Sequence, residues 1–172
     1  MADKTPRFER ASYAPREPFD ERTRRHRDLV RPLNIMVVDA TESAHFVLAT
    51  ILVQCGHEVV TFDSPDKALD ALASAVFDLA LVDYQMPEMD GIEFARHANL
   101  MLAGTGRKLA MCLTTAGIEQ EDLRTKDMRH FMAVIPKPMT LDKLLTVLED
   151  HLTNGIGSAV PFASKVADQK KQ

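Results

Sequence analysis

Four sets of side chains that could do chemistry lie at the ends of short apolar runs in the 172-residue sequence. They are the carboxylates Asp39 and Asp83, the hydroxyl pair Thr114–Thr115 and the amine of Lys137. A carboxylate can act as a nucleophile, and hydroxyl and ammonium groups can stabilise an anion. If the apolar runs are neighbouring strands of one sheet, these groups meet at one edge and form a polar site.

The segments that must position these residues alternate between short apolar runs and amphipathic stretches. Strands covered on both faces are short and largely apolar, and helices begin at capping residues such as Ser64 and Thr140. Alternation of this kind predicts a doubly wound α/β fold with a five-stranded parallel sheet, whose ligands bind outside the carboxyl ends of the strands. The expected strands are Ile35–Val38, Glu58–Phe62, Leu79–Val82, Leu109–Leu113 and Ala133–Ile135, and the expected helices are Ser43–Gln54, one from Ser64, Gly91–Met101, Glu119–Arg129 and one after Thr140.

Charge divides the chain into three parts. Residues 1–33 hold nine Lys/Arg against six Asp/Glu, and residues 154–172 hold three against one. The segment between them, residues 34–153, therefore carries a net charge of −9. We interpret it as one acidic domain flanked by a basic, Pro/Arg-rich extension and a flexible C-terminal tail.

The N-terminal extension contains one predicted helix, from Glu17 to Val30. Acids and bases spaced four residues apart support an exposed helix, and Pro32 would end it. We expect it to dock through Phe19, Leu29 and Val30. Because acids interleave with bases throughout the arm, the pattern argues against binding of nucleic acid.

Composition excludes several other classes. Two cysteines are too few for a disulfide framework, and the sequence has neither a signal peptide nor an apolar run of membrane-spanning length, so we expect a cytoplasmic protein that does not contact a membrane. The six histidines lack metal-ligand spacing and are predicted to lie on the surface or in turns.

Four stretches of the sequence, "VVDA", "LVDYQMPEMDG", "LTTAG" and "PKPMTLDKL", stand in this order and resemble the receiver domain of bacterial two-component response regulators. The resemblance covers residues 34–153 and implies a flavodoxin-like fold. It implies that Asp83 accepts a phosphoryl group from a partner histidine, that Thr115, in preference to Thr114, hydrogen-bonds that group, and that Lys137 neutralises it. It also suggests a cis Lys137–Pro138 bond.

The resemblance further implies a Mg²⁺ site made by Asp39, Asp83 and the backbone carbonyl of Gln85. Receivers usually end the first strand in two adjacent acids, whereas here Asp39 is followed by Ala40. The missing acid is the one that normally touches the metal. Either Asp39, or with less support Glu42, approaches the ion with water filling the gap, which gives weak Mg²⁺ binding, or the site has lost phosphoryl chemistry.

A second departure concerns the aromatic residue that often precedes the lysine by three positions. Here Val134 stands there, and it cannot make the inward swing of a tyrosine or phenylalanine. Phe131 or His130 could substitute, but backbone shifts after Thr115 are the simpler expectation.

The favoured function is a single-domain response regulator in a phosphorelay, a phosphoprotein rather than an enzyme, with at most weak autodephosphorylation. The roughly twenty residues after the last helix are too few for an output domain, so its signal would pass by protein contact. Its partners would be a histidine kinase or phosphotransfer protein and a downstream protein target, and a homodimer is compatible with the pattern. The alternatives are an unphosphorylated pseudo-receiver that only binds proteins and, more remotely, an aspartate-nucleophile phosphatase, for which Thr41 stands where a second aspartate is needed.

Overall fold

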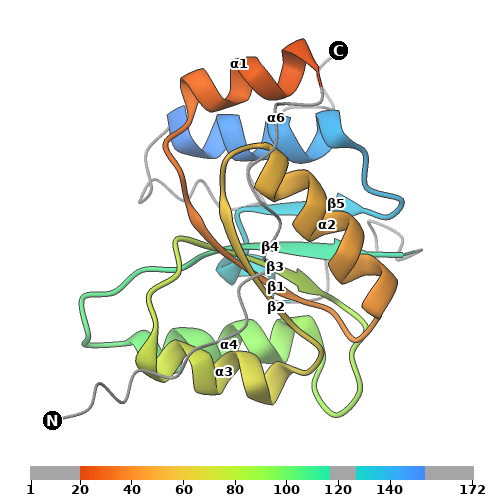
Figure 1. The fold of residues 1–172 in the computed structure, drawn as a ribbon. Coiled ribbons are helices and arrows are strands. Elements are labelled where there is room, and N and C mark those ends of the chain that lie inside the picture. The colour runs from red at the N-terminus through yellow and green to blue at the C-terminus, as the bar shows by residue number, and fades with distance from the viewer. Residues whose placement is uncertain (1–19, 117–126, 154–172) are drawn as a thin grey trace, which may run out of the picture.

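The computed structural model describes residues 20–116 and 127–153 and shows a parallel five-stranded sheet with the strand order β2-β1-β3-β4-β5. Helices cover both faces of the sheet (Figure 1), which confirms the predicted doubly wound fold. Among the described residues, no helix combines the length and apolar character needed to cross a membrane. The strands are β1 Asn34–Val38, β2 Glu58–Phe62, β3 Leu79–Asp83, β4 Ala110–Thr115 and β5 Ala133–Pro136, and the helices are α1 Glu21–Leu29, α2 Glu42–Gln54, α3 Pro65–Ser74, α4 Gly91–Leu102, the 3₁₀ turn η1 Met128–His130 and α6 Leu141–Thr153.

The strand register brings the carboxyl ends of the strands to one edge. Val38 is aligned with Val82 across β1 and β3, so Asp39 and Asp83 follow aligned positions. Asp83 is in turn aligned with Thr114 of β4, and Thr115 with Pro136 of β5. The residues singled out by their chemistry therefore share this edge, which we call the rim.

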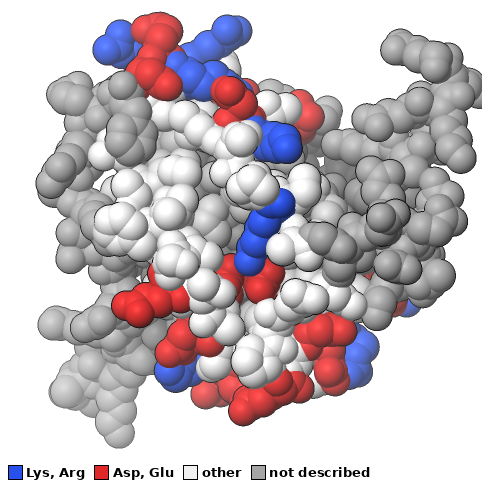
Figure 2. All heavy atoms as spheres, turned by 90° about the vertical axis from the view of Figure 1, so that its right-hand side faces the viewer, with Lys and Arg blue, Asp and Glu red and all other residues white. Residues whose placement is uncertain are grey.

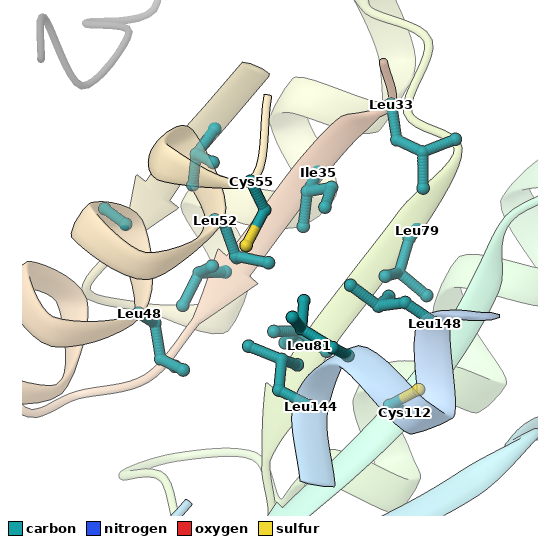
Figure 3. Close-up of a cluster of buried hydrophobic side chains, with 14 of the residues drawn as sticks. Leu33, Ile35, Leu48, Leu52, Cys55, Leu79, Leu81, Cys112, Leu144 and Leu148 are labelled. Atoms are coloured by element: carbon teal, nitrogen blue, oxygen red, sulfur yellow. The ribbon is translucent and has the colours of Figure 1, made fainter. Parts of the chain in front are cut away.

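The core lies in two layers because successive strand residues point to opposite faces of the sheet. Ile35 and Leu81 face α2 and α6, where Leu52 and Leu144 complete the cluster (Figure 3). Met36, Val38, Ala80 and Val82 face α3 and α4 and pack with Phe94 and Met111. Both faces of the central strands are thus buried, which explains their continuous apolar sequence.

Local signals place the helix starts close to their predicted positions. The Ser64 side chain accepts a hydrogen bond from the Lys67 N–H at 3.4 Å, with Pro65 as the first helical residue of α3. The helix predicted at Glu119–Arg129 lies mostly in residues 117–126, outside the described residues, and its last part belongs to η1.

Helix α1 packs against α6 (Figure 1), but the contact differs from the prediction. Val30 is buried, whereas Leu29 is 61% exposed, and Phe19 lies outside the described residues. The side chain of His26 is fully buried instead, together with His57 from the turn before β2. The prediction of a surface or turn histidine is therefore wrong for His26, and His57 lies in a turn but is not at the surface.

Candidate functional site

Asp83 is the last residue of β3 and is only 6% exposed. The chain turns directly after it, and Gly91 at the start of α4 packs back against it. A Cβ atom on Gly91 would lie 2.5 Å from the Asp83 carbonyl oxygen and 2.9 Å from Leu113 Cδ1. Position 91 therefore needs glycine because the backbone passes too close for any side chain, and this close approach fixes the acid at the rim.

Lys137 lies between the two carboxylates of the rim. Its Nζ is 2.7 Å from Asp39 Oδ2 and 2.9 Å from Asp83 Oδ1. The second oxygen of Asp39 accepts a hydrogen bond from the Thr41 N–H at 2.8 Å. The Lys137–Pro138 bond is cis, as the resemblance to receiver domains suggested. The structure therefore brings together the two acids and the amine that were predicted from strands far apart in the sequence.

The space-filling view looks onto the face at which the strands end. A basic side chain lies near the middle of this face against acidic side chains, and further acids gather below it (Figure 2). When all three groups are ionised, Asp39, Asp83 and Lys137 carry a net charge of −1. The cluster is therefore short of positive charge, which favours the approach of a cation.

Burial raises the pKa of the Asp83 carboxyl. The hydrogen bond from Lys137 opposes this effect and the nearby Asp39 charge adds to it, so that the pKa lies above its ordinary value. For Lys137 burial lowers the pKa, but its hydrogen bonds to Asp39 and Asp83 outweigh burial, and the pKa is raised. The amine therefore stays protonated at neutral pH and holds both acids.

The two threonines at the end of β4 differ in their hydrogen bonds. The Thr114 hydroxyl is 3.4 Å from the Val82 carbonyl oxygen. The Thr115 hydroxyl is buried and has no hydrogen-bond partner among the described residues. The backbone carbonyl of Thr115 accepts a hydrogen bond from the backbone N–H of Lys137 at 2.8 Å. A buried hydroxyl without a partner costs free energy unless something binds it. Thr115 is thus the better candidate to contact a ligand at the rim.

The donors that could hold a metal are two carboxylates and one carbonyl. Gln85 is exposed in the loop two residues after Asp83, and Ala40 is exposed directly after Asp39. The part of the chain that the structure describes contains no group of three or more His, Cys, Asp or Glu side chains that could hold a metal ion. Oxygen donors of this type suit Mg²⁺, which keeps several waters. A site with a third carboxylate, at position 40, would offer the ion more oxygen ligands than this one does.

The two residues suggested as substitutes for an aromatic switch lie in different surroundings. Phe131 is 2% exposed and belongs to the core layer against α3 and α4. His130 contacts Asn99 and Asp127 at the surface of η1. Val134 is partly buried against the same core layer as Phe131. Phe131 is therefore a packing residue in this structure.

Comparison with known proteins identifies the family. Residues 35–149 match the family model of the response regulator receiver domain, so the chain belongs to this family. The sensory/regulatory protein RpfC of Xanthomonas campestris is 31% identical over 126 residues, which cover 73% of this chain and 17% of that protein. The sensor histidine kinase AruS of Pseudomonas aeruginosa is 26% identical over 132 residues, which cover 77% of this chain and 13% of that protein. The chain thus spans less than a fifth of the length of these relatives.

Solved structures agree with the fold. The chemotaxis protein CheY4 of Vibrio cholerae superimposes with a TM-score of 0.62 at 23% identity, over 69% of this chain and 98% of that one. A signal receiver domain from Pseudomonas fluorescens superimposes with a TM-score of 0.63 at 22% identity, over 72% of this chain and 97% of that one. Receiver domains generally bind Mg²⁺ at their acidic pocket and interact with histidine kinases and phosphotransfer proteins.

Proposed function

We propose that this domain accepts a phosphoryl group on Asp83 from a histidine kinase or phosphotransfer protein and signals by protein contact. The observation that carries the proposal is the rim cluster. In it, the Lys137 amine lies 2.9 Å from Asp83, and the buried Thr115 hydroxyl has no hydrogen-bond partner among the described residues. The cluster thus supplies a nucleophile for phosphoryl transfer, together with a cation and a hydrogen-bond donor that can stabilise the transferred group.

In the proposed step an Asp83 carboxylate oxygen attacks the phosphorus of a phosphohistidine. The new O–P bond forms as the N–P bond breaks, and the electron pair of that bond returns to the imidazole nitrogen, which can take up a proton. Lys137 neutralises one oxygen of the transferred group, and Thr115 donates its hydroxyl hydrogen to another. The domain acts as an acceptor, with at most slow loss of the phosphate.

Asp39, Asp83 and the carbonyl of Gln85 would hold Mg²⁺ in this domain, with water at the remaining positions. A bound Mg²⁺ would screen the repulsion between the incoming phosphoryl oxygens and the carboxylates. Because Ala40 supplies no ligand, we expect this affinity to be weak. Asp39 keeps its orientation through Lys137 and the Thr41 N–H, which hold one oxygen each.

The experiment that tests the proposal is incubation of the full chain with a small-molecule phosphodonor over a range of Mg²⁺ concentrations. Intact-protein mass spectrometry should show the addition of one phosphoryl group, and trapping by borohydride reduction should locate it at Asp83. Chelation of the metal should slow the labelling. A chain that gains no phosphoryl group at any Mg²⁺ concentration would show that the proposal is wrong.

The second candidate is a pseudo-receiver that binds a protein partner without phosphorylation. Ala40 favours it, because the position that would complete the metal site has no carboxylate. Under this alternative the partner binds with equal affinity whether or not a phosphodonor and Mg²⁺ are present.

Replacing Ala40 by aspartate should tighten Mg²⁺ binding. The added carboxylate follows Asp39 directly and supplies one more oxygen ligand, so we expect the dissociation constant to fall on the order of 10-fold. Titration of Mg²⁺ followed by NMR or calorimetry measures the change. Ala103→Asp adds the same charge just after α4, at the other end of the sheet, and should leave the affinity unchanged. Equal gains in the two variants would point to net charge alone.

Helix α2 begins at the rim and carries two exposed apolar side chains, Phe46 (59% exposed) and Val47 (51%). A partner that delivers a phosphoryl group to Asp83 must cover this part of the surface. We therefore expect Phe46→Ser to slow transfer from a phosphohistidine protein by about 10-fold, because a buried aromatic contact contributes on the order of 1–2 kcal/mol to such interfaces. Labelling by a small-molecule donor should not change.

The matched control for Phe46→Ser is Leu100→Ser. Leu100 is 63% exposed on α4, which covers the other face of the sheet (Figure 1). If Leu100→Ser slows transfer as much as Phe46→Ser, the partner does not dock beside α2.

A further inference from the structure

A buried pair of histidines joins α1 to the rest of the domain. His26 is 0% exposed on α1, and His57 is 3% exposed in the turn between α2 and β2. Their Nε2 atoms are 3.0 Å apart, and the rings are nearly perpendicular, with an interplanar angle of 84°. The outer nitrogen of His26, Nδ1, lies 3.0 Å from Glu149 Oε1 on α6.

The neighbours of the pair allow only one placement of the protons when both rings are neutral. The Leu33 backbone N–H donates to His57 Nδ1 at 3.3 Å, so that nitrogen carries no proton. The Glu149 carboxylate can only accept, so His26 Nδ1 carries its proton. His57 must then donate from Nε2 to the bare Nε2 of His26. The chain of hydrogen bonds runs from Leu33 through His57 and His26 to Glu149, and each ring nitrogen is satisfied.

A third proton breaks this chain. On His26 it would occupy Nε2 and face the Nε2–H of His57, and on His57 it would occupy Nδ1 and face the Leu33 N–H. In either case two donors point at each other inside a buried contact, and a hydrogen bond is lost. The neutral pair is therefore the form that fits under α1.

Charged groups surround the pair on each element that packs against it. Burial lowers the pKa of His26, which Glu149 of α6 opposes and Arg22 of α1 reinforces. Burial, the neighbouring His26 and, less strongly, Arg27 lower the pKa of His57 to about 3, while Asp78 before β3 opposes the shift. Burial raises the pKa of the nearby Cys55 thiol to about 12, so this thiol stays neutral at the pH values at which histidines titrate.

We infer that acid releases α1 from its contact with α6. Helix α1 is docked while His26 and His57 are neutral, and it is freed when they take up protons. Other contacts among the described residues also hold it. Both terminal guanidinium nitrogens of Arg22 bind the Glu149 carboxylate, and Arg22 Nε lies 3.6 Å from Asp142 Oδ1. Arg27 Nε donates to the Gln54 carbonyl at 2.9 Å, and Thr23 and Val30 are buried. The inference does not depend on phosphorylation of Asp83.

The direction of the pH effect follows from proton linkage. An undocked α1 leaves the histidines near their ordinary pKa of about 6.5, whereas the docked form lowers it. The undocked form therefore binds more protons, and docking weakens as the pH falls below about 6.5. Below about pH 6.5, each histidine lowers the docking constant by up to 10-fold for every unit by which the pH falls. Above this pH, neither histidine affects docking.

Imidazole ¹⁵N NMR of the full chain tests the proton arrangement directly. At pH 7.5 we expect neutral rings of opposite tautomer, with the proton on Nδ1 of His26 and on Nε2 of His57. Rings that carry the same tautomer, or that both titrate near pH 6.5 while α1 stays docked, would overturn the inference. This measurement needs no variant and does not depend on whether a mutant folds.

Hydrogen exchange tests the release. Between pH 7.5 and 5.0, after correction for intrinsic exchange rates, protection of α1 amides should fall at least 10-fold while that of β1 and β3 is kept. His57→Gln keeps a donor toward His26, and His57→Asn keeps an acceptor for Leu33, but neither titrates. In whichever variant stays docked at pH 7.5, the fall should be smaller. His97→Gln on α4 should behave as the wild type. A wild-type α1 equally protected at both pH values would exclude release.

Discussion

Asp83→Asn is expected to abolish phosphorylation by small-molecule donors, with a loss on the order of 1000-fold or more, because the amide oxygen is a poor nucleophile. The folded domain should not lose stability. Burial raises the pKa of Asp83 in the fold, so its ionised form opposes folding above the ordinary carboxyl pKa, and a neutral amide removes that cost. At pH 7 we therefore expect the melting temperature to stay the same or rise. Mass spectrometry and thermal denaturation measure the two effects.

The matched control for Asp83→Asn is Asp90→Asn. Asp90 caps α4 by accepting hydrogen bonds from Ile92 N–H and Glu93 N–H, both at 2.9 Å. Asparagine is an equally good cap, so this variant should be labelled as well as the wild type. A phosphoryl group on the Asp83→Asn chain would mean that another residue is the acceptor.

Lys137→Met is expected to give the largest loss of stability among these variants, about 3 kcal/mol at pH 7.5. The substitution leaves Asp39 and Asp83, whose side chains are 2% and 8% exposed, as a buried pair of like charges with no ammonium between them. Such a pair binds a proton more readily, so the pKa of Asp83, already raised, should rise further. A carboxyl group whose pKa is higher in the folded state than in the unfolded state stabilises the fold only at low pH, where it is protonated. The loss should therefore be smaller at pH 4.5 than at pH 7.5.

Urea denaturation of the wild type and Lys137→Met at these two pH values measures the effect. Lys108→Met removes an exposed lysine, distant from the rim, and should cost little at either pH. The double variant Asp39→Asn/Lys137→Met removes one of the two repelling charges and should recover at least half of the lost stability. If it recovers nothing, Lys137 contributes through packing instead of through charge.

Much of the fold was predictable because its signals are local. Ser64–Pro65 marks the start of α3 by capping chemistry, and the apolar run Leu79–Val82 indicates a buried strand, so both follow from a few neighbouring residues. That the chemically useful residues share one edge needs only the additional rule that parallel strands end on the same side. The types of residue at the rim were therefore predictable from sequence.

Contacts between distant segments were not predictable. The sequence does not indicate that His26 meets Glu149, 123 positions away, or that the other ring nitrogen of His26 meets His57. The expected docking residue Leu29 is exposed, because the orientation of a short helix is set by the surface it meets and not by its own apolar residues alone.

The sequence by itself determined the doubly wound order of elements and the chemical types at the strand ends, since both depend on neighbouring residues and on general rules of chain topology. The tertiary structure decided which of those groups touch. It placed Lys137 between Asp39 and Asp83, left the Thr115 hydroxyl without a partner among the described residues, and buried His26 against His57. Such contacts depend on positions within about an ångström, which only the packing of the whole domain fixes.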